Sequence, residues 1–342
     1  MRAGTRTHAV YARAGAESIL QRTGARKSLL FEANTSKLCG NHFPGRIMTK
    51  QQADYYNQQY NARAMIPDHP YIFTRWLKDS AQVRRTHAAL FDLAYGEASG
   101  ERLDFFPARA SGAPLLVFIH GGWWRSLDKS DFSFIAPAFV QAGFNVALTN
   151  YTLAPQASIA DIVLQQLRAL AWLYRNAEQY DFDPGRIMVA GHSAGAHLAA
   201  MMMAAVWPVF GADLPHDLVK AGVLLSGLYD LEPVRHAEFV NVDLKLDAEN
   251  VASLSPAGMP QAHAAPFLTA CGGLESEEFK RQTRLLAQRW QNNHAGEVPL
   301  PEANHLTICD AFATPGHPLH DASVQLLTGA GKGAAQHKIA SA

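Results

Sequence analysis

A turn between a short apolar strand and a helix of small residues is the feature that most constrains this chain. Residues 187–190 are all apolar, residues 191–195 spell Gly-His-Ser-Ala-Gly, and residues 194–205 are rich in Ala and Met. A serine at such a point must occupy a strained turn that exposes its hydroxyl, and the flanking glycines let the strand and the helix approach it. The pattern therefore predicts that Ser193 is a nucleophile. The alternative is a glycine-rich turn with an incidental serine.

Apolar runs of strand length alternate with segments of helix length through most of the chain. The predicted strands are 91–95, 101–106, 115–119, 145–149, 187–190, 223–226 and 267–271. The predicted helices are 51–90, broken by Pro67 and Pro70, then 134–142, 159–176, 194–204 and 277–292. This alternation with short links predicts an α/β fold with a mostly parallel central sheet and helices on both faces. Residues 51–90 and 229–254 are expected to form a small helical cap.

A second glycine-containing turn follows the apolar run 115–119, where the chain continues His-Gly-Gly-Trp-Trp from residue 120. Glycines there free the backbone to turn its N–H groups toward a substrate carbonyl oxygen. We therefore predict an oxyanion hole made by the backbone N–H groups of Gly122, Trp123 and Ala194. Trp124 and Gly121 are candidate lining residues of a substrate pocket. His120 is expected to brace the loop rather than to transfer protons.

A serine nucleophile of this kind needs a histidine base and an acid, which follow it in the order Ser, acid, His. His305 lies in a loop just before the predicted terminal helix and is the candidate base. Glu275 follows the strand 267–271 and is the candidate acid, since a carboxylate at that edge can reach an imidazole. Asp230, which follows the preceding strand, is the alternative acid.

The formal net charge of zero conceals two unlike segments. Residues 1–47 hold eight basic and two acidic side chains, so the remainder of the chain is acidic by six charges. We expect 1–47 to be a basic extension outside the fold, with a transit peptide as the alternative, 48–327 to be one domain and 328–342 a flexible tail. The overall balance argues against a nucleic-acid or anionic-membrane partner. Three scattered cysteines suggest neither a disulfide framework nor a metal site and fit a cytoplasmic location.

Five motifs taken together resemble the kynurenine formamidase (arylformamidase) and esterase branch of the α/β-hydrolase superfamily. They are HGGWWRSLDKSDFSFIAP, YTLAP, GHSAGAHLAA, SGLYDLEPV and GGLESEEFKRQ, and DYYNQQYNARAMIPDHP at 54–70 is similar to the N-terminal region of that branch. The resemblance covers about residues 50–325. Two positions depart from the family pattern: Glu275 stands where an aspartate is common, and Trp123 stands where a tyrosine is frequent.

The resemblance implies a serine hydrolase that removes a small acyl group from an aromatic amide through an acyl-enzyme. N-formylkynurenine, from tryptophan catabolism, would be the namesake substrate. It also implies that no metal or organic cofactor is needed, and the only expected partner is the small-molecule substrate. A carboxylesterase acting on aryl or short-chain esters is the alternative enzyme, and a binding module on the same scaffold is the non-enzyme alternative. The oligomeric state stays open, a homodimer included.

Overall fold

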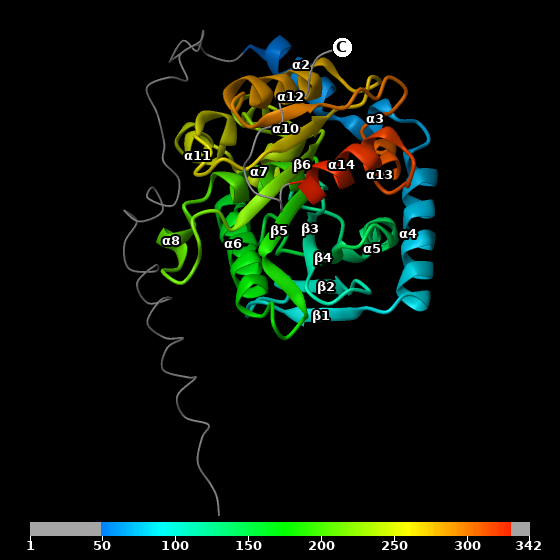
Figure 1. Cartoon of the computed structure of the whole chain (residues 1–342). Coiled ribbons are helices and arrows are strands. Elements are labelled where there is room, and N and C mark those ends of the chain that lie inside the picture. Colours follow the sequence, from blue (N-terminus) through cyan, green and yellow to red (C-terminus); the bar gives the residue numbers. More distant parts are fainter. Residues whose placement is uncertain (1–48, 330–342) are drawn as a thin grey trace, which may run out of the picture.

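The computed structural model describes residues 49–329, and its centre is one eight-stranded sheet (Figure 1). The expected extension 1–47 and nearly all of the expected tail 328–342 lie outside the described residues. The strands are β1 (Leu90–Ala94), β2 (Arg102–Phe106), β3 (Ala113–Ile119), β4 (Asn145–Thr149), β5 (Phe182–His192), β6 (Val219–Leu225), β7 (Phe267–Ala270) and β8 (His294–Glu297).

The sheet has the order β1-β2-β4-β3-β5-β6-β7-β8. Strand β2 is antiparallel to both of its neighbours, and all pairs from β4 to β8 are parallel. The carboxyl ends of β5, β6 and β7 therefore meet at one edge, and the loops that follow these three strands lie next to one another. In open parallel sheets this edge is where ligands bind.

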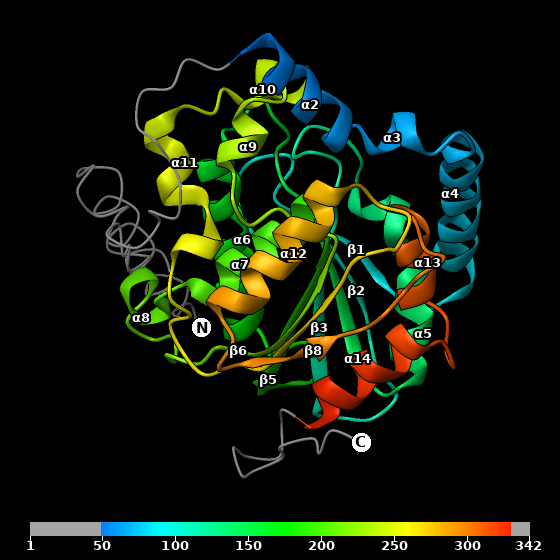
Figure 2. The same cartoon turned by 90° about the horizontal axis from the view of Figure 1, so that it is seen from above.

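Helices cover both faces of the sheet (Figures 1 and 2). They are α2 (Lys50–Tyr60), α3 (Ala62–Met65), α4 (His69–Thr86), α5 (Ala136–Gln141), α6 (Ile159–Arg175), α7 (Ala194–Ala204), α8 (Trp207–Phe210), α9 (Glu232–Arg235), α10 (Glu238–Leu244), α11 (Ala248–Leu254), α12 (Glu277–Arg289), α13 (Thr307–Phe312) and α14 (Pro318–Gly329). Two 3-10 helices, η2 (Lys129–Ile135) and η3 (Pro256–Gly258), complete the set that residues 49–329 contain.

Strand β3 shows why the sheet needs cover on both sides. Leu115 and Val117 belong to the core cluster formed with α6, α7 and α12. Leu116 and Phe118, which point to the opposite face, belong to the cluster formed with α4, α5, α13 and α14. Successive side chains of a strand alternate between faces, so a continuous apolar run indicates a strand buried on both sides, as predicted for 115–119.

The predicted α/β-hydrolase architecture is confirmed, and the differences are local. The segment 51–90 forms three helices rather than two, because the Asn61 side chain accepts from Ala64 N–H and begins α3 as a separate turn. Pro70 lies in the first turn of α4 and does not break it, since a first-turn residue needs no N–H donor. Similarly, the helix expected over 134–142 begins at Ala136, with Pro137 in its first turn.

Two further differences lie near the end of the sheet. The helix expected over 277–292 ends at Arg289. Strand β8, which reads His-Ala-Gly-Glu, was not predicted because it has no apolar run. The cap region consists of α2 and α3 together with α9, α10 and α11. No helix within residues 49–329 is both long enough and apolar enough to cross a bilayer.

Candidate active site

Ser193 lies at the junction of β5 and α7 in a backbone conformation that L-residues rarely adopt, with φ 57° and ψ −120°. The flanking glycines make this turn sterically feasible. A Cβ on Gly191 would lie 2.2 Å from the carbonyl oxygen of Gly195, and a Cβ on Gly195 would lie 2.0 Å from that of Ile119. Glycine is therefore required at both positions, and the sharp turn presents the serine hydroxyl at the carboxyl edge of the sheet.

His305 lies between β8 and α13, and its imidazole faces Ser193. The distance from His305 Nε2 to Ser193 Oγ is 3.0 Å, although 112 residues separate the two in the chain. The imidazole also lies against the ring of Phe279, with 4.2 Å between centroids. The predicted nucleophile and base are thus within hydrogen-bond distance of each other in a buried setting.

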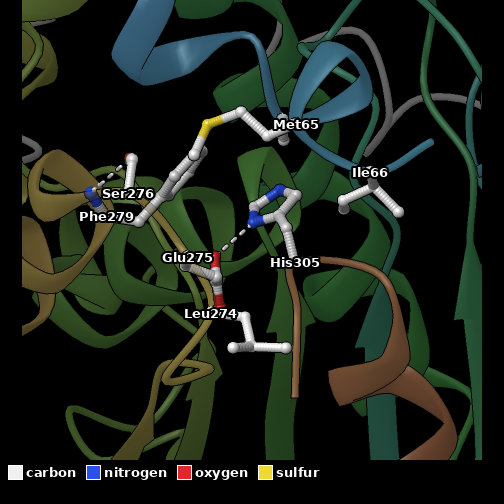
Figure 3. Close-up of a pocket in the computed structure, with 8 residues that line it drawn as sticks. Met65, Ile66, Leu274, Glu275, Ser276, Phe279 and His305 are labelled. Atoms are coloured by element: carbon white, nitrogen blue, oxygen red, sulfur yellow. Dashed lines mark hydrogen bonds and ion pairs between the residues drawn. The ribbon is translucent and has the colours of Figure 1, made fainter. Parts of the chain in front are cut away.

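Glu275 occupies the other side of the imidazole, as Figure 3 shows. Its Oε2 lies 2.6 Å from His305 Nδ1, and its side chain has no exposed surface. The second oxygen, Oε1, accepts hydrogen bonds from the Ser226 hydroxyl and from the backbone N–H of Gly272, both at 2.6 Å. Both oxygens of this buried carboxylate thereby accept hydrogen bonds, which hold it against His305.

Asp230, the alternative acid, lies elsewhere. Its carboxylate accepts from Arg281 Nη1 at 3.3 Å and from the backbone N–H of Glu232. It therefore stabilises the start of α9 and pairs with α12, and it does not contact His305.

The loop after β3 is packed directly against the serine turn. A Cβ on Gly121 would lie 2.8 Å from the carbonyl oxygen of His192 and 3.1 Å from Ser193 Cβ. Gly122 and Trp123 both have positive φ values, of 103° and 56°. Across residues 49–329, no acceptor bonds the backbone N–H groups of Gly122, Trp123 or Ala194. These three donors are therefore available to a ligand.

The two tryptophans of this loop have different environments. Trp123 is half-buried and meets the rings of Tyr60 and Phe239 edge to face. Trp124 is fully buried and packs against His197, with 5.0 Å between ring centroids. Trp124 therefore belongs to the core and does not line the cavity, which corrects its expected place in the pocket.

A small cavity lies above the imidazole of His305 (Figure 3). Its volume is about 10 Å³, close to the room that one water molecule requires. The lining residues are Ala62, Met65, Ile66, Leu274, Glu275, Ser276, Phe279 and His305. The sequence identified only Glu275 and His305 of this set, because nothing in the apolar pattern of 62–66 distinguishes a pocket wall from a core face.

The chain is similar to known hydrolases. The BD-FAE family model matches residues 103–207, from β2 to just after α7. The kynurenine formamidase of Danio rerio is 32% identical over 209 residues, which cover 59% of this chain and 69% of the relative. That of Salmo salar is 31% identical over 245 residues, covering 68% and 81%. The chain belongs to the kynurenine formamidase family.

A solved structure supports the fold. A candidate thioesterase from Silicibacter sp. TM1040 superimposes with a TM-score of 0.68 at 30% identity, covering 79% of this chain and 98% of the other. The chain is accordingly a hydrolase with the α/β-hydrolase fold.

The surroundings of the site keep neighbouring titratable groups neutral in this formamidase-family hydrolase. Burial lowers the pKa of His192 well below its usual range, and the adjacent His305 lowers it further. Burial likewise lowers the pKa of His120, whose Nε2 lies 2.9 Å from the Asn150 side-chain oxygen. His120 thus braces the loop, as expected. Burial raises the pKa of the Cys271 thiol, so this cysteine is protonated and unreactive near neutral pH.

The part of the chain that the structure describes contains no group of three His, Cys, Asp or Glu side chains that could hold a metal ion. The polar groups around Ser193 are instead hydrogen-bond partners of one another. The chemistry that this arrangement can support is nucleophilic attack with proton transfer through an imidazole.

Proposed function

We propose that this protein is a serine hydrolase that removes a formyl group from an aromatic amide, with Ser193, His305 and Glu275 as its catalytic residues. The observation that carries the proposal is the continuous hydrogen-bonded chain from Ser193 Oγ through the His305 imidazole to Glu275. A nucleophile hydrogen-bonded to a base that a third group orients is the arrangement that nucleophilic catalysis requires.

The first half of the reaction forms an acyl-enzyme. His305 Nε2 accepts the proton of Ser193 as its oxygen attacks the carbonyl carbon of the substrate, and Glu275 stabilises the resulting imidazolium. The oxyanion is bound by the backbone N–H groups of Gly122, Trp123 and Ala194. The proposal for these donors rests on their having no acceptor among the described residues and on the close packing of Gly121 against the serine turn. Each such donor contributes on the order of 10²–10³ in rate.

The second half regenerates the enzyme. The imidazolium donates its proton to the leaving amine, which departs as the C–N bond breaks. His305 then takes a proton from water, the hydroxide attacks the acyl carbon, and the acid leaves as Ser193 recovers its proton.

The cavity supports a small acyl group and an apolar leaving group. The cavity beside the imidazole has a volume of only about 10 Å³, which favours a small acyl group over a bulky one. An aromatic leaving group must extend past Met65 and Leu274, whose side chains are 44% and 62% exposed at the rim. N-formylkynurenine, the substrate implied by the family, combines a formyl group with an aromatic amine.

A substrate comparison tests this proposal. Purified wild-type protein should deformylate N-formylkynurenine with a higher kcat/KM than it shows for p-nitrophenyl acetate. Higher turnover of the ester would favour the alternative, a carboxylesterase that uses the same three residues on aryl or short-chain esters.

Ser193→Ala provides the matched control for catalysis. This variant should fold normally, as judged by circular dichroism, and should lose turnover of both substrates and labelling by a fluorophosphonate probe. A wild-type protein that the probe does not label would support the non-enzyme alternative, a binding module.

A further inference from the structure

Arg63 lies on α3, the short helix that supplies Ala62 and Met65 to the wall of the cavity. Two contacts fix its guanidinium. Nη2 donates to the Ser126 hydroxyl at 3.3 Å, and the carbon Cζ lies 5.1 Å from the centre of the Phe73 ring. A guanidinium held over an aromatic face and by a hydroxyl loses little further freedom when it binds a ligand.

Ser126 connects this guanidinium to the loop that follows β3. Its hydroxyl lies 2.9 Å from the carbonyl oxygen of Gly122 and donates to it, and its backbone N–H donates to the same oxygen at 3.0 Å. The guanidinium of Arg63 is therefore two hydrogen bonds away from the carbonyl oxygen of Gly122, the residue whose N–H is a proposed oxyanion donor. Its side chain is exposed, next in sequence to Ala62 and two residues from Met65, which line the cavity.

The charge around Arg63 is uncompensated. The neighbouring Arg125 pairs with Asp243 at 2.6 Å, whereas Arg63 forms no ion pair with any residue in 49–329. Partial burial lowers the pKa of Arg63, and the positive charge of Arg125 lowers it further. Glu275, the one carboxylate that lines the cavity, already accepts hydrogen bonds from Ser226 and Gly272 and contacts His305. An anion placed beside Arg63 would meet positive charge and no competing acid.

We propose that Arg63 binds a carboxylate carried by the leaving group of the substrate, and so selects aryl amides that have this carboxylate over those that lack it. This inference rests on the proposed function. A formyl group has no substituent that could hold a carboxylate. The carboxylate must therefore belong to the amine portion, which extends toward the rim where α3 lies. The remaining N–H groups of the guanidinium can form a paired contact with both carboxylate oxygens.

Two substitutions with equal loss of charge test the assignment. Arg63→Met keeps a long apolar stem, and Arg109→Met is the matched control, since Arg109 precedes β3 at the opposite end of that strand from the site. Deformylation of N-formylkynurenine is compared with that of its carboxamide, which has the same shape without the negative charge. Circular dichroism of each variant establishes that it is folded.

Arg63→Met should raise KM for the carboxylate substrate by about 10- to 100-fold, the range for a lost hydrogen bond to a charged group. Its kcat/KM for the carboxamide should stay within about threefold of wild type, and Arg63→Lys should recover part of the carboxylate preference. Arg109→Met should leave the KM and kcat/KM of both substrates unchanged. Equal losses on both substrates would mean that Arg63 only holds the loop, and unchanged kinetics on both would also overturn the proposal.

If the proposed function is wrong, the kinetics of the wild-type protein show it, independently of the Arg63 variants. Wild-type protein would then cleave neither formamide while still cleaving aryl acetates. The same variants would be assayed on phenyl acetates with and without a carboxylate on the ring. A selective loss on the carboxylated ester in Arg63→Met would still support the anion site, and an unselective effect would overturn it.

Discussion

The Nε2–H group of His192 donates a hydrogen bond to the backbone carbonyl oxygen of His305 at 2.6 Å, across 113 residues of chain. His192 immediately precedes the proposed nucleophile, and His305 is the proposed base. The bond therefore ties the serine turn to the loop that carries the imidazole. It also fixes the tautomer of His192, because a carbonyl oxygen can only accept. The Nδ1 atom is buried and has no partner among the described residues.

Removing the hydrogen bond between His192 and the His305 carbonyl should displace the His305 imidazole without unfolding the protein. We expect His192→Leu to lower kcat by about 10²-fold, the effect of a displacement of about 1 Å at a reacting group. His192→Gln, whose amide can place a donor close to the position of Nε2, should retain most of the activity. Steady-state kinetics with circular dichroism as the folding control would measure this, and equal activity in the two variants would contradict it.

The backbone strain at Ser193 should appear as a difference in the free energy of unfolding between two variants. Its φ of 57° and ψ of −120° lie in a region that costs an L-residue roughly 1–3 kcal/mol, whereas glycine adopts it freely. After allowance for the flexibility of glycine in the unfolded chain, Ser193→Gly should exceed Ser193→Ala in free energy of unfolding by about 1 kcal/mol. Urea unfolding of the two inactive variants provides the comparison. A Gly variant that is no more stable would show that the turn is not strained.

Substitution of the two candidate acids, Glu275 and Asp230, should affect kcat very differently. Glu275→Gln should lower kcat by about 10³–10⁴-fold, because an amide cannot offset the charge of the imidazolium and can misdirect its tautomer. Asp230→Asn should stay within about threefold of wild type, because it removes only one partially exposed ion pair with Arg281. The measurement that decides is the ratio of the two kcat values. A much lower kcat in Asp230→Asn than in Glu275→Gln would make Asp230 the acid instead of Glu275.

Buried histidines should make the protein sensitive to mild acid. Burial lowers the pKa of His197 to about 4, against about 6.5 in an unfolded chain. The unfolded state therefore binds more protons below pH 6.5. The contribution of His197 to stability is complete above that pH and is lost progressively as the pH falls to about 4. A shift of this size corresponds to roughly 3 kcal/mol.

Urea unfolding at a series of pH values tests this dependence. His197→Gln, which can still donate to the Leu254 carbonyl oxygen that His197 Nε2 contacts at 2.8 Å, should show a flatter decline between pH 6.5 and 4. A variant curve parallel to that of wild type would indicate that His197 is protonated in the folded state.

The sequence alone determined the features that depend on local chemistry. The strand, the glycines and the helix around Ser193 are contiguous, so a single pattern specified the turn together with its proposed nucleophile. The alternation of apolar runs determined the fold class, because a strand buried on both faces must be apolar throughout. The proposal of His305 as the base followed from chain order, since the base comes last in this arrangement.

Only the tertiary structure distinguishes the surroundings of Glu275 from those of Asp230. Both carboxylates follow strands of the sheet, and no local pattern says which one reaches an imidazole 30 or more residues away. Their hydrogen-bond partners favour Glu275 as the acid: Glu275 is held by Ser226 and Gly272 against His305, whereas Asp230 pairs with Arg281.

The cavity wall and the place of Arg63 were likewise decided by packing. Ala62 and Met65 come next to the imidazole because α3 folds over the carboxyl edge of the sheet, more than 200 residues away from His305 in the chain. Trp124 was expected at the pocket and lies in the core, since consecutive residues of a turn can point to opposite sides. Local sequence determines which backbone shapes are accessible. Which side chains meet is determined by burial of apolar surface and by satisfaction of buried polar groups, and both depend on the whole fold.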